Sequence, residues 1–321
     1  MPAVSVIMPA YDVEPYIGDA IRSALAQTFR DFELIVVDDG SKDGTAGVIR
    51  ALAREDSRIQ LVQQPNRGLA AARNSALRAA RGDFFALLDS DDLWAPEFLA
   101  EQLAILAARP EVDIVTGNGW ILDGSNHGRL ARPSPDPRPV PDLTSIIGDE
   151  WSVFIMSVIR RRVYTTIGSF DESMRSNEDY DFWLRAALAG FTFARNDRPL
   201  GHYRIRAGSL SASEVRMLGG ILKVYDKLRP MIADRPHEMS ILERQINRFE
   251  GELLAAEARL ALDTGDYQSA ARHLEALGSH RPSASLTVAR SLARWTPALL
   301  AWLYRLRRAH LERAAQRRVA S

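Results

Sequence analysis

The sequence predicts an α/β fold with a mostly parallel, Rossmann-like sheet flanked by helices, followed by a C-terminal helical extension. In the first half of the chain, short apolar runs rich in β-branched residues alternate with segments of helical periodicity, which is typical of βαβ units. The apolar runs are continuous, as strands covered on both faces require. After about residue 211 the pattern is helical to the end.

The expected elements follow one another in a regular order. We expect five strands and four intervening helices in this first part. The strands are Val4–Met8, Leu34–Val37, Ile59–Val62, Phe84–Leu88 and Val112–Val115, and the helices cover Pro15–Gln27, Gly44–Arg54, Leu69–Ala80 and Pro96–Ala108.

Later segments are more varied. Residues 118–149 are rich in proline and glycine, which predicts a loop region. A further strand is expected at Val153–Ile159 and a helix near Asp179–Ala189. Residues 252–277 are expected to form a helical hairpin with a break at residues 264–266. We therefore expect a catalytic domain over residues 1–210 and a helical extension over residues 211–321.

Composition excludes several classes of protein. The chain has 321 residues, 46% of them hydrophobic, which is enough for a real core in one large or two ordinary domains. The absence of cysteine excludes a disulfide scaffold, a thiolate metal site and a cysteine nucleophile. With 41 basic and 41 acidic side chains, the chain lacks the basic excess of a general nucleic-acid binder. The N-terminus does not resemble a secretory signal, no segment is apolar enough to span a membrane, and a cytoplasmic protein is expected.

Acidic clusters are expected at the ends of strands and at the start of a helix. The carboxyl ends of parallel strands meet at one edge of a sheet, where ligands bind. Crowded carboxylates favour a cation, and oxygen ligands suit Mg²⁺ or Mn²⁺. For any one cluster a turn or a helix cap is the simpler interpretation. The clusters are Asp38-Asp39, Asp89-Ser90-Asp91-Asp92 and Glu178-Asp179-Tyr180-Asp181.

A series of short motifs over residues 1–210 resembles the family 2 glycosyltransferases, which are inverting enzymes of the GT-A fold. Each match alone is weak, and their order along the chain makes the series specific. The C-terminal third has no such match. The matching stretches are Val4–Tyr11, Val36–Thr45, Asn66–Gly68, Ala72–Asn74, Leu88–Asp92, Gly168–Glu172, Ser176–Arg185 and Tyr203–Arg204.

The resemblance implies a nucleotide-sugar donor bound near the first strands. Tyr11 is expected to stack on the base, with Pro9 fixing the turn, and Asp39 to accept a hydrogen bond from the base. Arg67 and Arg73 are expected to reach the base or the diphosphate, although either arginine is equally a candidate for plain surface charge.

Asp89-Ser90-Asp91 matches the DXD motif of the family, and the resemblance implies a divalent cation there, Mg²⁺ or Mn²⁺. Asp91 is the expected metal ligand, and Asp89 is expected to bind the ribose or support the metal. The metal would neutralise charge on the departing nucleoside diphosphate. Asp92 is expected to cap the following helix, in which Pro96 suits the first turn.

The base that deprotonates the acceptor hydroxyl is expected at Asp179, with Glu178 as an alternative. The simpler interpretation of Asp179 is a negative charge at the start of a helix. Phe182 and Trp183 are expected in the core.

One position departs from the family pattern. Members of the family often have a histidine two residues after the Tyr-Arg pair, where this sequence has Arg206. Because arginine stays protonated, it does not ligate a metal. We expect Arg206 to lie on a mobile loop that closes over the donor and to bind the diphosphate. The stretch Arg160–Arg162 is a candidate for binding an anionic acceptor or, more simply, a solvated strand end.

The C-terminal segment is strongly basic, although the whole chain has a net charge of zero. Residues 281–321 contain nine arginines and one acidic residue, together with several leucines and aromatic residues. This composition fits a helix lying on an anionic membrane surface and equally a helix packed on its own domain or on a partner subunit.

The sequence therefore predicts an inverting hexosyltransferase that moves a sugar from a UDP- or GDP-type donor to the hydroxyl of a saccharide or lipid-linked acceptor. Polysaccharide or glycolipid synthesis is the expected setting. Two alternatives stay open: a sugar-phosphate nucleotidyltransferase and a non-catalytic nucleotide-sugar-binding scaffold. A nucleotidyltransferase usually needs a Gly-rich phosphate loop after the first strand, which this sequence lacks. The donor sugar, the acceptor and the oligomeric state are not predicted.

Overall fold

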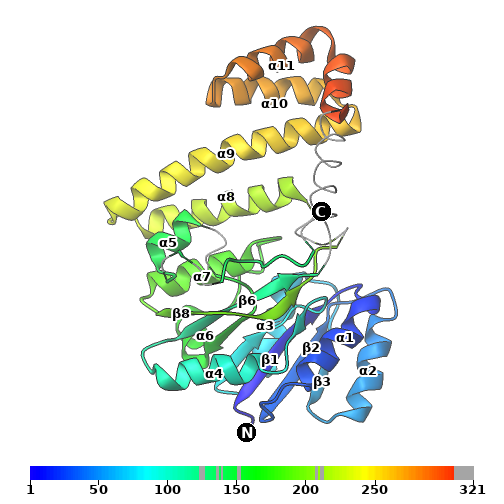
Figure 1. Cartoon of the computed structure of the whole chain (residues 1–321), viewed down its shortest axis with the longest axis vertical. Coiled ribbons are helices and arrows are strands. Elements are labelled where there is room, and N and C mark those ends of the chain that lie inside the picture. Colours follow the sequence, from blue (N-terminus) through cyan, green and yellow to red (C-terminus); the bar gives the residue numbers. More distant parts are fainter. Residues whose placement is uncertain are drawn as a thin grey trace. The chain divides into compact units, whose positions relative to one another are not determined.

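A computed structural model describes residues 1–122, 127–134, 137–138, 140–149, 153–206, 209 and 213–306. The chain forms two compact units, Met1–Arg206 and Ala207–Ser321 (Figure 1). Residues 307–321, which hold five of the nine arginines of the C-terminal segment, lie outside the described residues, as do Pro135, Pro139 and Trp151.

The first unit is built on an eight-stranded sheet of order β3-β2-β1-β4-β7-β6-β8-β5. Strands β1 to β4 run parallel, whereas β7 is antiparallel to both of its neighbours and β5 is antiparallel to β8. The strands are β1 Val4–Ala10, β2 Phe32–Asp38, β3 Ile59–Gln63, β4 Phe84–Leu87, β5 Leu93–Trp94, β6 Ile114–Ile121, β7 Ser157–Arg160 and β8 Phe193–Tyr203.

Helices cover the sheet and connect its strands. Both β1 and β2 are buried along their whole length, which explains their continuous apolar runs. The alanine-rich face of α3 packs on β1 and β2, where short side chains allow close approach. The helices of this unit are α1 Glu14–Leu25, α2 Thr45–Glu55, α3 Leu69–Ala79, α4 Phe98–Ala108, α5 Leu143–Gly148, α6 Arg161–Ile167 and α7 Glu178–Leu188.

The predicted α/β class with a mostly parallel sheet is confirmed, but the loop expected over residues 118–149 is partly wrong. Strand β6 continues to Ile121, because its second half pairs with β8. Asn118 in this half is buried, and its side-chain amide exchanges hydrogen bonds with the backbone of Arg132. Helix α5 starts at a capping box made by Asp142 and Ser145. The loop prediction rested on the proline content and gave less weight to this local signal for a helix start. The strand expected at Val153–Ile159 begins only at Ser157, although the residues before it are buried.

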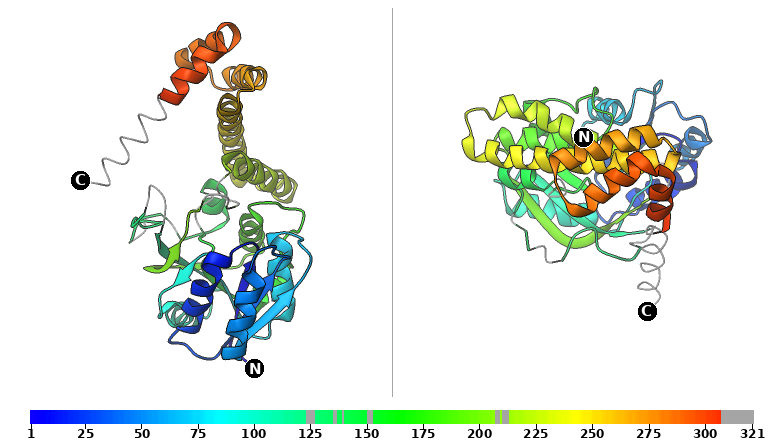
Figure 2. Two further views of the ribbon diagram at one scale, coloured as in Figure 1. Left: turned by 90° about the vertical axis from the view of Figure 1, so that its right-hand side faces the viewer. Right: turned by 90° about the horizontal axis from the view of Figure 1, so that it is seen from above.

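The second unit is helical, as the sequence predicts. The expected hairpin break is confirmed at Gly265, which ends α9 with a φ of 79° in the left-handed region that glycine adopts most easily. Asp266 then caps α10 by accepting a hydrogen bond from the Ser269 amide. The helices are α8 Glu214–Met231, α9 Pro236–Thr264, α10 Tyr267–His280 and α11 Ala284–Trp295, and residues 297–306 are also helical (Figure 2).

In the described part of the chain, no helix combines the length and the apolar character that crossing a membrane requires.

Candidate functional site

The carboxyl ends of β1, β2 and β4 meet at one edge of the sheet. Ala10 pairs with Asp38, and Ile7 pairs with Leu87, in parallel register. The loops that follow these three strands therefore leave the sheet from the same edge. Because ligands of open α/β sheets bind at this edge, we place the candidate site there.

The Asp39 carboxylate organises the loop that follows β3. It accepts hydrogen bonds from the Gln64 side chain at 2.7 Å and from the backbone amides of Arg67 and Gly68 at 2.9 and 2.7 Å. Asp39 is buried, so these bonds offset the cost of removing its charge from water. Asp39 thus fixes the loop after β3, and a nucleobase that bonds to Asp39 would share an oxygen that already accepts a hydrogen bond.

Tyr11 stands at the end of β1 with its side chain 40% exposed. Pro9 is buried two residues earlier, inside the strand. Asp12 adopts a φ of 48° and accepts a hydrogen bond from the Lys42 amide at 2.7 Å, which ties the loops after β1 and β2 together. Gly40 is required in the second loop, because its φ is 75° and a Cβ there would lie 2.7 Å from a backbone nitrogen.

Arg73 is the centre of the candidate site. Its side chain projects from α3, is only 2% exposed, and donates to Asp89 at 2.6 Å and to Glu178. The guanidinium also lies 5.7 Å from the centre of the Phe170 ring. Arg73 thus joins the loop of Asp89–Asp92, called the DXD loop below, to the start of α7, and its burial excludes the alternative of plain surface charge.

The carboxylates around Arg73 outnumber its single positive charge. Asp89, Glu178 and Asp179 all act on the guanidinium electrostatically. Burial, with Asp179 and Asp89 nearby, raises the pKa of Glu178 to about 7 against the opposing effect of Arg73. Burial also raises the pKa of Asp179, and the negative charge of Asp89 adds to this effect. The cluster therefore holds a proton more readily than ordinary carboxylates do.

Helix α7 begins with three acidic residues, Glu178, Asp179 and Asp181, whose charges favour a helix N-terminus. The residue before them, Asn177, has a φ of 60°, a conformation that asparagine tolerates better than most residues. The Asp179 carboxylate accepts a hydrogen bond from the Tyr180 amide at 2.9 Å. Phe182 and Trp183 are buried, which confirms their expected place in the core.

The DXD loop follows β4. Asp91 accepts a hydrogen bond from Nε of Arg206 at 2.6 Å. Burial raises the pKa of Asp91, while the hydrogen bond from Arg206 acts in the opposite direction. Burial together with the charges of Asp91 and Asp89 raises the pKa of Asp92 well above its usual value.

The expected cap at Asp92 is wrong. Helix α4 starts at Phe98 without a side-chain cap, whereas Asp92 accepts a hydrogen bond from the backbone amide of Arg204 at 2.8 Å. Within the described residues, Oδ2 of Asp92 has no hydrogen-bond partner. Asp92 therefore fixes the end of β8 beside the DXD loop.

Two arginines stack on one ring at this point. The guanidinium groups of Arg204 and Arg206 lie 4.8 and 5.6 Å from the centre of the Tyr16 ring on α1. Nε of Arg204 also donates to the Asp91 carbonyl at 2.9 Å. Sequence reasoning missed Tyr16 altogether, because an aromatic residue in the first turn of a helix carries no sign of such a role.

The remaining motifs hold the site together. Arg67 is half exposed and pairs with Glu172 at 2.6 Å. Asn74 exchanges two hydrogen bonds of 2.9 Å with the backbone of Phe170, which fixes the segment that precedes α7. The motifs at residues 72–74 and 168–172 thus lie in direct contact.

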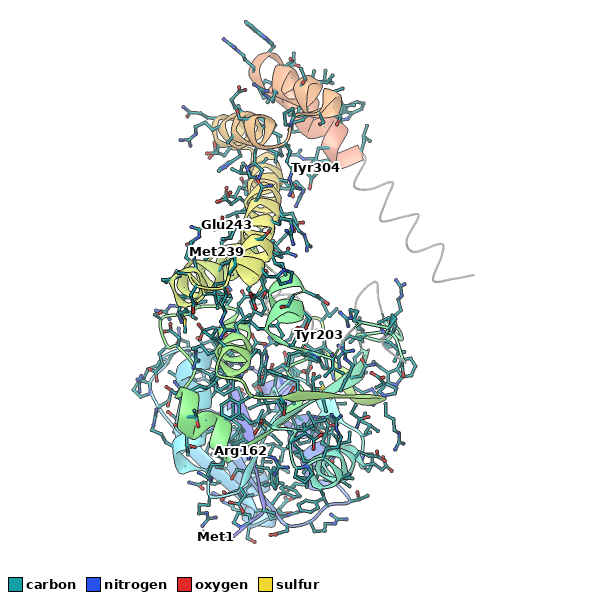
Figure 3. All side chains as sticks on the ribbon, turned by 90° about the vertical axis from the view of Figure 1, so that its left-hand side faces the viewer. Met1, Arg162, Tyr203, Met239, Glu243 and Tyr304 are labelled. Carbon is teal, nitrogen blue, oxygen red and sulfur yellow. The ribbon has the colours of Figure 1, made fainter. Side chains whose placement is uncertain are left out.

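Arg160, Arg161 and Arg162 (Arg162 is labelled in Figure 3) are engaged in structural contacts. Arg160 donates to the carbonyls of residues 106 and 112, and Arg161 donates to those of residues 80 and 82. Arg162 pairs with Asp113 at 2.5 Å. The structure therefore gives these three arginines a structural role at the end of β7.

The donor atoms at the DXD loop are of the kind that Mg²⁺ and Mn²⁺ prefer. Asp89 and Asp91 supply hard carboxylate oxygens from one loop, which suffices for a cation that also binds phosphate oxygens. Both carboxylates, however, are paired with arginines, and the described residues include no group of three side chains arranged to hold a metal.

Curated relatives match about two thirds of the chain. "Uncharacterized glycosyltransferase EpsJ" of Bacillus subtilis is 32% identical over 221 residues, which is 66% of this chain and 63% of that protein. "Putative teichuronic acid biosynthesis glycosyltransferase TuaG" of the same organism is 33% identical over 218 residues, 66% of this chain and 83% of that protein. The chain covers less than two thirds of the length of EpsJ.

Solved structures share the fold. TarS 1–349 of S. aureus in complex with UDP-GlcNAc has a TM-score of 0.67 at 22% identity, covering 94% of this chain and 91% of that one. The mannosyltransferase PcManGT of Pyrobaculum calidifontis, in complex with GDP-Man and Mn²⁺, has a TM-score of 0.59 at 22% identity, covering 99% and 87%.

The family model described as "Glycosyl transferase family 2" matches residues 5–175, which is more than half of the chain. The match begins at the second residue of β1, includes the DXD loop and the ion-paired Arg73, and ends just before α7. The chain belongs to glycosyl transferase family 2.

Proposed function

We propose that this chain is an inverting glycosyltransferase that transfers a sugar from a UDP- or GDP-sugar to the hydroxyl of a saccharide or lipid-linked acceptor. Synthesis of a bacterial-type polysaccharide or glycolipid is the proposed setting, supported by the name of the relative TuaG. A cytoplasmic location remains part of the proposal.

The observation that carries this proposal is the arrangement around Arg73. One buried guanidinium holds Asp89 of the DXD loop and Glu178 at the start of α7, so the leaving-group side and the base side of the reaction share one support. An inverting displacement needs both sides in fixed geometry, because loss of the hydroxyl proton accompanies departure of the diphosphate.

The donor would bind along the edge formed by the loops after β1 and β2. Tyr11, with its exposed ring, is proposed to stack on the nucleobase, and Pro9, two residues earlier inside β1, would fix the backbone that leads to it. Asp39 is proposed to accept a hydrogen bond from the base, and Arg67 to approach the base or diphosphate. The complexes of TarS with UDP-GlcNAc and of PcManGT with GDP-Man support a nucleotide-sugar donor.

Asp91 and Asp89 would hold the divalent cation, and Arg206 would bind the diphosphate. A bound Mg²⁺ or Mn²⁺ supplies positive charge that stabilises the leaving nucleoside diphosphate. The complex of PcManGT with Mn²⁺ supports the presence of such a cation. Arg206 suits the diphosphate because its guanidinium forms two parallel hydrogen bonds with phosphate oxygens.

Asp179 is proposed as the base, with Glu178 beside it. Asp179 takes the proton of the acceptor hydroxyl at its carboxylate oxygen while the hydroxyl oxygen attacks the anomeric carbon. Its raised pKa brings it closer to the operating pH, which favours proton transfer. Glu178 is held by Arg73, and the charge of Asp179 contributes to its raised pKa.

Release of nucleoside diphosphate from a panel of UDP- and GDP-sugars tests the proposal. The purified chain is assayed with Mg²⁺ or Mn²⁺ and a set of saccharide and lipid-linked acceptors. We expect release of UDP or GDP that depends on the acceptor and is abolished in Asp91→Ala. Formation of pyrophosphate from a nucleoside triphosphate and a sugar phosphate would instead indicate a nucleotidyltransferase. Donor binding without turnover on any acceptor would indicate a scaffold.

We also propose that the end of the helical unit binds an anionic membrane surface, where a lipid-linked acceptor would lie. The helix at residues 297–306 has apolar side chains on two faces. Leu300, Ala301 and Tyr304 pack on α9 and α10. Tyr304 is labelled in Figure 3. On other sides of the helix, Leu299, Trp302, Leu303 and Leu306 are exposed at a spacing typical of one helical stripe, and Trp295 just before them is 76% exposed.

Charge favours a membrane as the occupant of this stripe. Residues 281–321 carry nine arginines against one acidic residue, and exposed tryptophans suit the interface of a bilayer. The packing expected as the alternative is also present, because the other face of the helix contacts its own unit.

Flotation with liposomes checks the membrane proposal. We expect the chain to float with liposomes that contain anionic lipid and not with neutral ones, and the double variant Trp302→Ser/Leu303→Ser to lose most of this binding. Leu260→Ser, which changes an exposed residue of α9, is the matched control and should bind as the wild type does. Equal flotation of all three proteins, or flotation without anionic lipid, would exclude this surface as an electrostatic membrane contact.

A further inference from the structure

The ion pair between Arg206 and Asp91 puts a cation on the carboxylate that is proposed to bind the metal. Nε of Arg206 lies 2.6 Å from Oδ2 of Asp91, and the side chains are 24% and 17% exposed. The pair is therefore largely removed from water. In this partly buried position the attraction between the two charges is screened less than at the surface. The ring of Tyr16 supports the guanidinium from the side.

Each carboxylate of the DXD loop interacts with an arginine in the absence of a metal. Asp89 pairs with Arg73, Asp91 pairs with Arg206, and Arg204 donates its backbone amide to Asp92 and acts on that side chain electrostatically. A divalent cation that joins Asp91 while Arg206 stays in place would add two positive charges next to a guanidinium. Mutual repulsion then opposes binding of the metal.

The three arginines differ in how easily they leave the loop. Arg73 is 2% exposed and is held by two carboxylates. Arg204 is tied to the loop by its backbone amide and by Nε. Arg206 contacts the Asp91 carboxylate and the Tyr16 ring, both through its side chain. Arg206 is therefore the arginine that can exchange partners without disturbing the fold.

We infer that Arg206 and the divalent cation compete for Asp91, and that the donor diphosphate resolves the competition by drawing Arg206 onto its own oxygens. The inference rests on the proposed function, because it takes Asp91 as the metal ligand. Diphosphate brings negative charge for Arg206 and further oxygen ligands for the metal. Metal and nucleotide should therefore bind cooperatively, and by linkage each raises the affinity for the other by the same factor.

The inference is tested by measuring how tightly the full chain binds Mn²⁺ with and without UDP or GDP. The EPR signal of the free ion reports the unbound Mn²⁺. Without nucleotide, we expect Arg206→Gln to bind Mn²⁺ about tenfold more tightly than the wild type, the size expected for loss of a competing, partly desolvated charge. Arg206→Lys keeps the positive charge and should stay near the wild type. The factor by which the nucleotide raises Mn²⁺ affinity should fall in Arg206→Gln, because no competitor is left to remove.

Two variants serve as controls. Arg198→Gln changes an exposed arginine of β8 that pairs with Glu101, and its Mn²⁺ affinity should equal that of the wild type. Asp91→Asn should remove Mn²⁺ binding in both the wild-type and the Arg206→Gln background, which places the metal at this carboxylate.

Unchanged or weaker Mn²⁺ binding by nucleotide-free Arg206→Gln would overturn the inference, and Arg206 would then act on the diphosphate alone. Mn²⁺ binding that survives Asp91→Asn would overturn it as well. If none of the proteins binds Mn²⁺, the proposed competition for Asp91 is also wrong. Release of nucleoside diphosphate in the presence of EDTA would still support the proposed transferase activity. The two failures are thus distinguishable.

Discussion

Replacing Asp179 by asparagine is expected to lower kcat for sugar transfer by about 10²–10⁴-fold, the usual contribution of a positioned general base. Asparagine has nearly the same shape and keeps an oxygen that accepts the hydrogen bond from the Tyr180 amide. The fold and the donor site should therefore survive. The measurement compares kcat with the dissociation constant of UDP or GDP, which should change little. Weakened nucleotide binding with an unchanged kcat would mean that Asp179 is not the base.

The pH dependence gives a second readout of the same residue. A base acts in its deprotonated form, so kcat/KM should rise with pH through the apparent pKa of the Glu178 and Asp179 cluster. Burial raises the pKa of both groups, that of Glu178 to about 7, so the acid limb should lie above the range of ordinary carboxylates. The limb should disappear from the residual activity of Asp179→Asn. An acid limb at the pKa of an exposed aspartate would contradict this assignment.

Replacing Arg73 by methionine is expected to lower the free energy of unfolding by about 3–5 kcal/mol, as loss of one partner of a buried ion pair does. The change leaves Glu178 buried without its counter-ion, and it also removes the partner of Asp89. For a domain of this size the melting temperature should fall by about 10 °C or more. Thermal or urea unfolding measures the effect, and Arg67→Met, at a half-exposed arginine, is the matched control with a small expected change.

A double variant separates the lost ion pair from lost packing. Arg73→Met/Glu178→Gln should be more stable than Arg73→Met alone, because the unpaired buried charge is gone. The deficit of Arg73→Met should also shrink at low pH. The raised pKa of Glu178 means that the folded state favours the neutral carboxyl, so this group destabilises the fold as pH rises from its usual pKa toward about 7. A deficit that is independent of pH and unaffected by Glu178→Gln would assign the effect to packing.

Much of the fold was predictable from local sequence. The buried strands β1 and β2 are continuous apolar runs, and the break between α9 and α10 is marked by Gly265 and the capping residue Asp266. The prediction was wrong where long-range strand pairing or a helix cap produced regular structure in a proline-rich segment. The prolines of residues 118–149 indicated a loop, while pairing of β6 with β8 and the capping box of α5 produced regular structure within that range.

The sequence by itself determined which chemistry is present: carboxylates at the ends of strands and at the start of α7, an exposed aromatic residue after β1, and a basic, aromatic-rich C-terminal segment. These features are local, because turns, caps and strand ends depend on a few neighbouring residues.

Only the tertiary structure decided which charges meet. Arg73 joins Glu178 across 105 positions of sequence, and Arg206 joins Asp91 across 115. Among 41 basic and 41 acidic side chains the sequence carries no signal of these pairings. They arise because the order of the strands in the sheet brings the ends of distant elements to one edge, where burial makes each pairing energetically decisive.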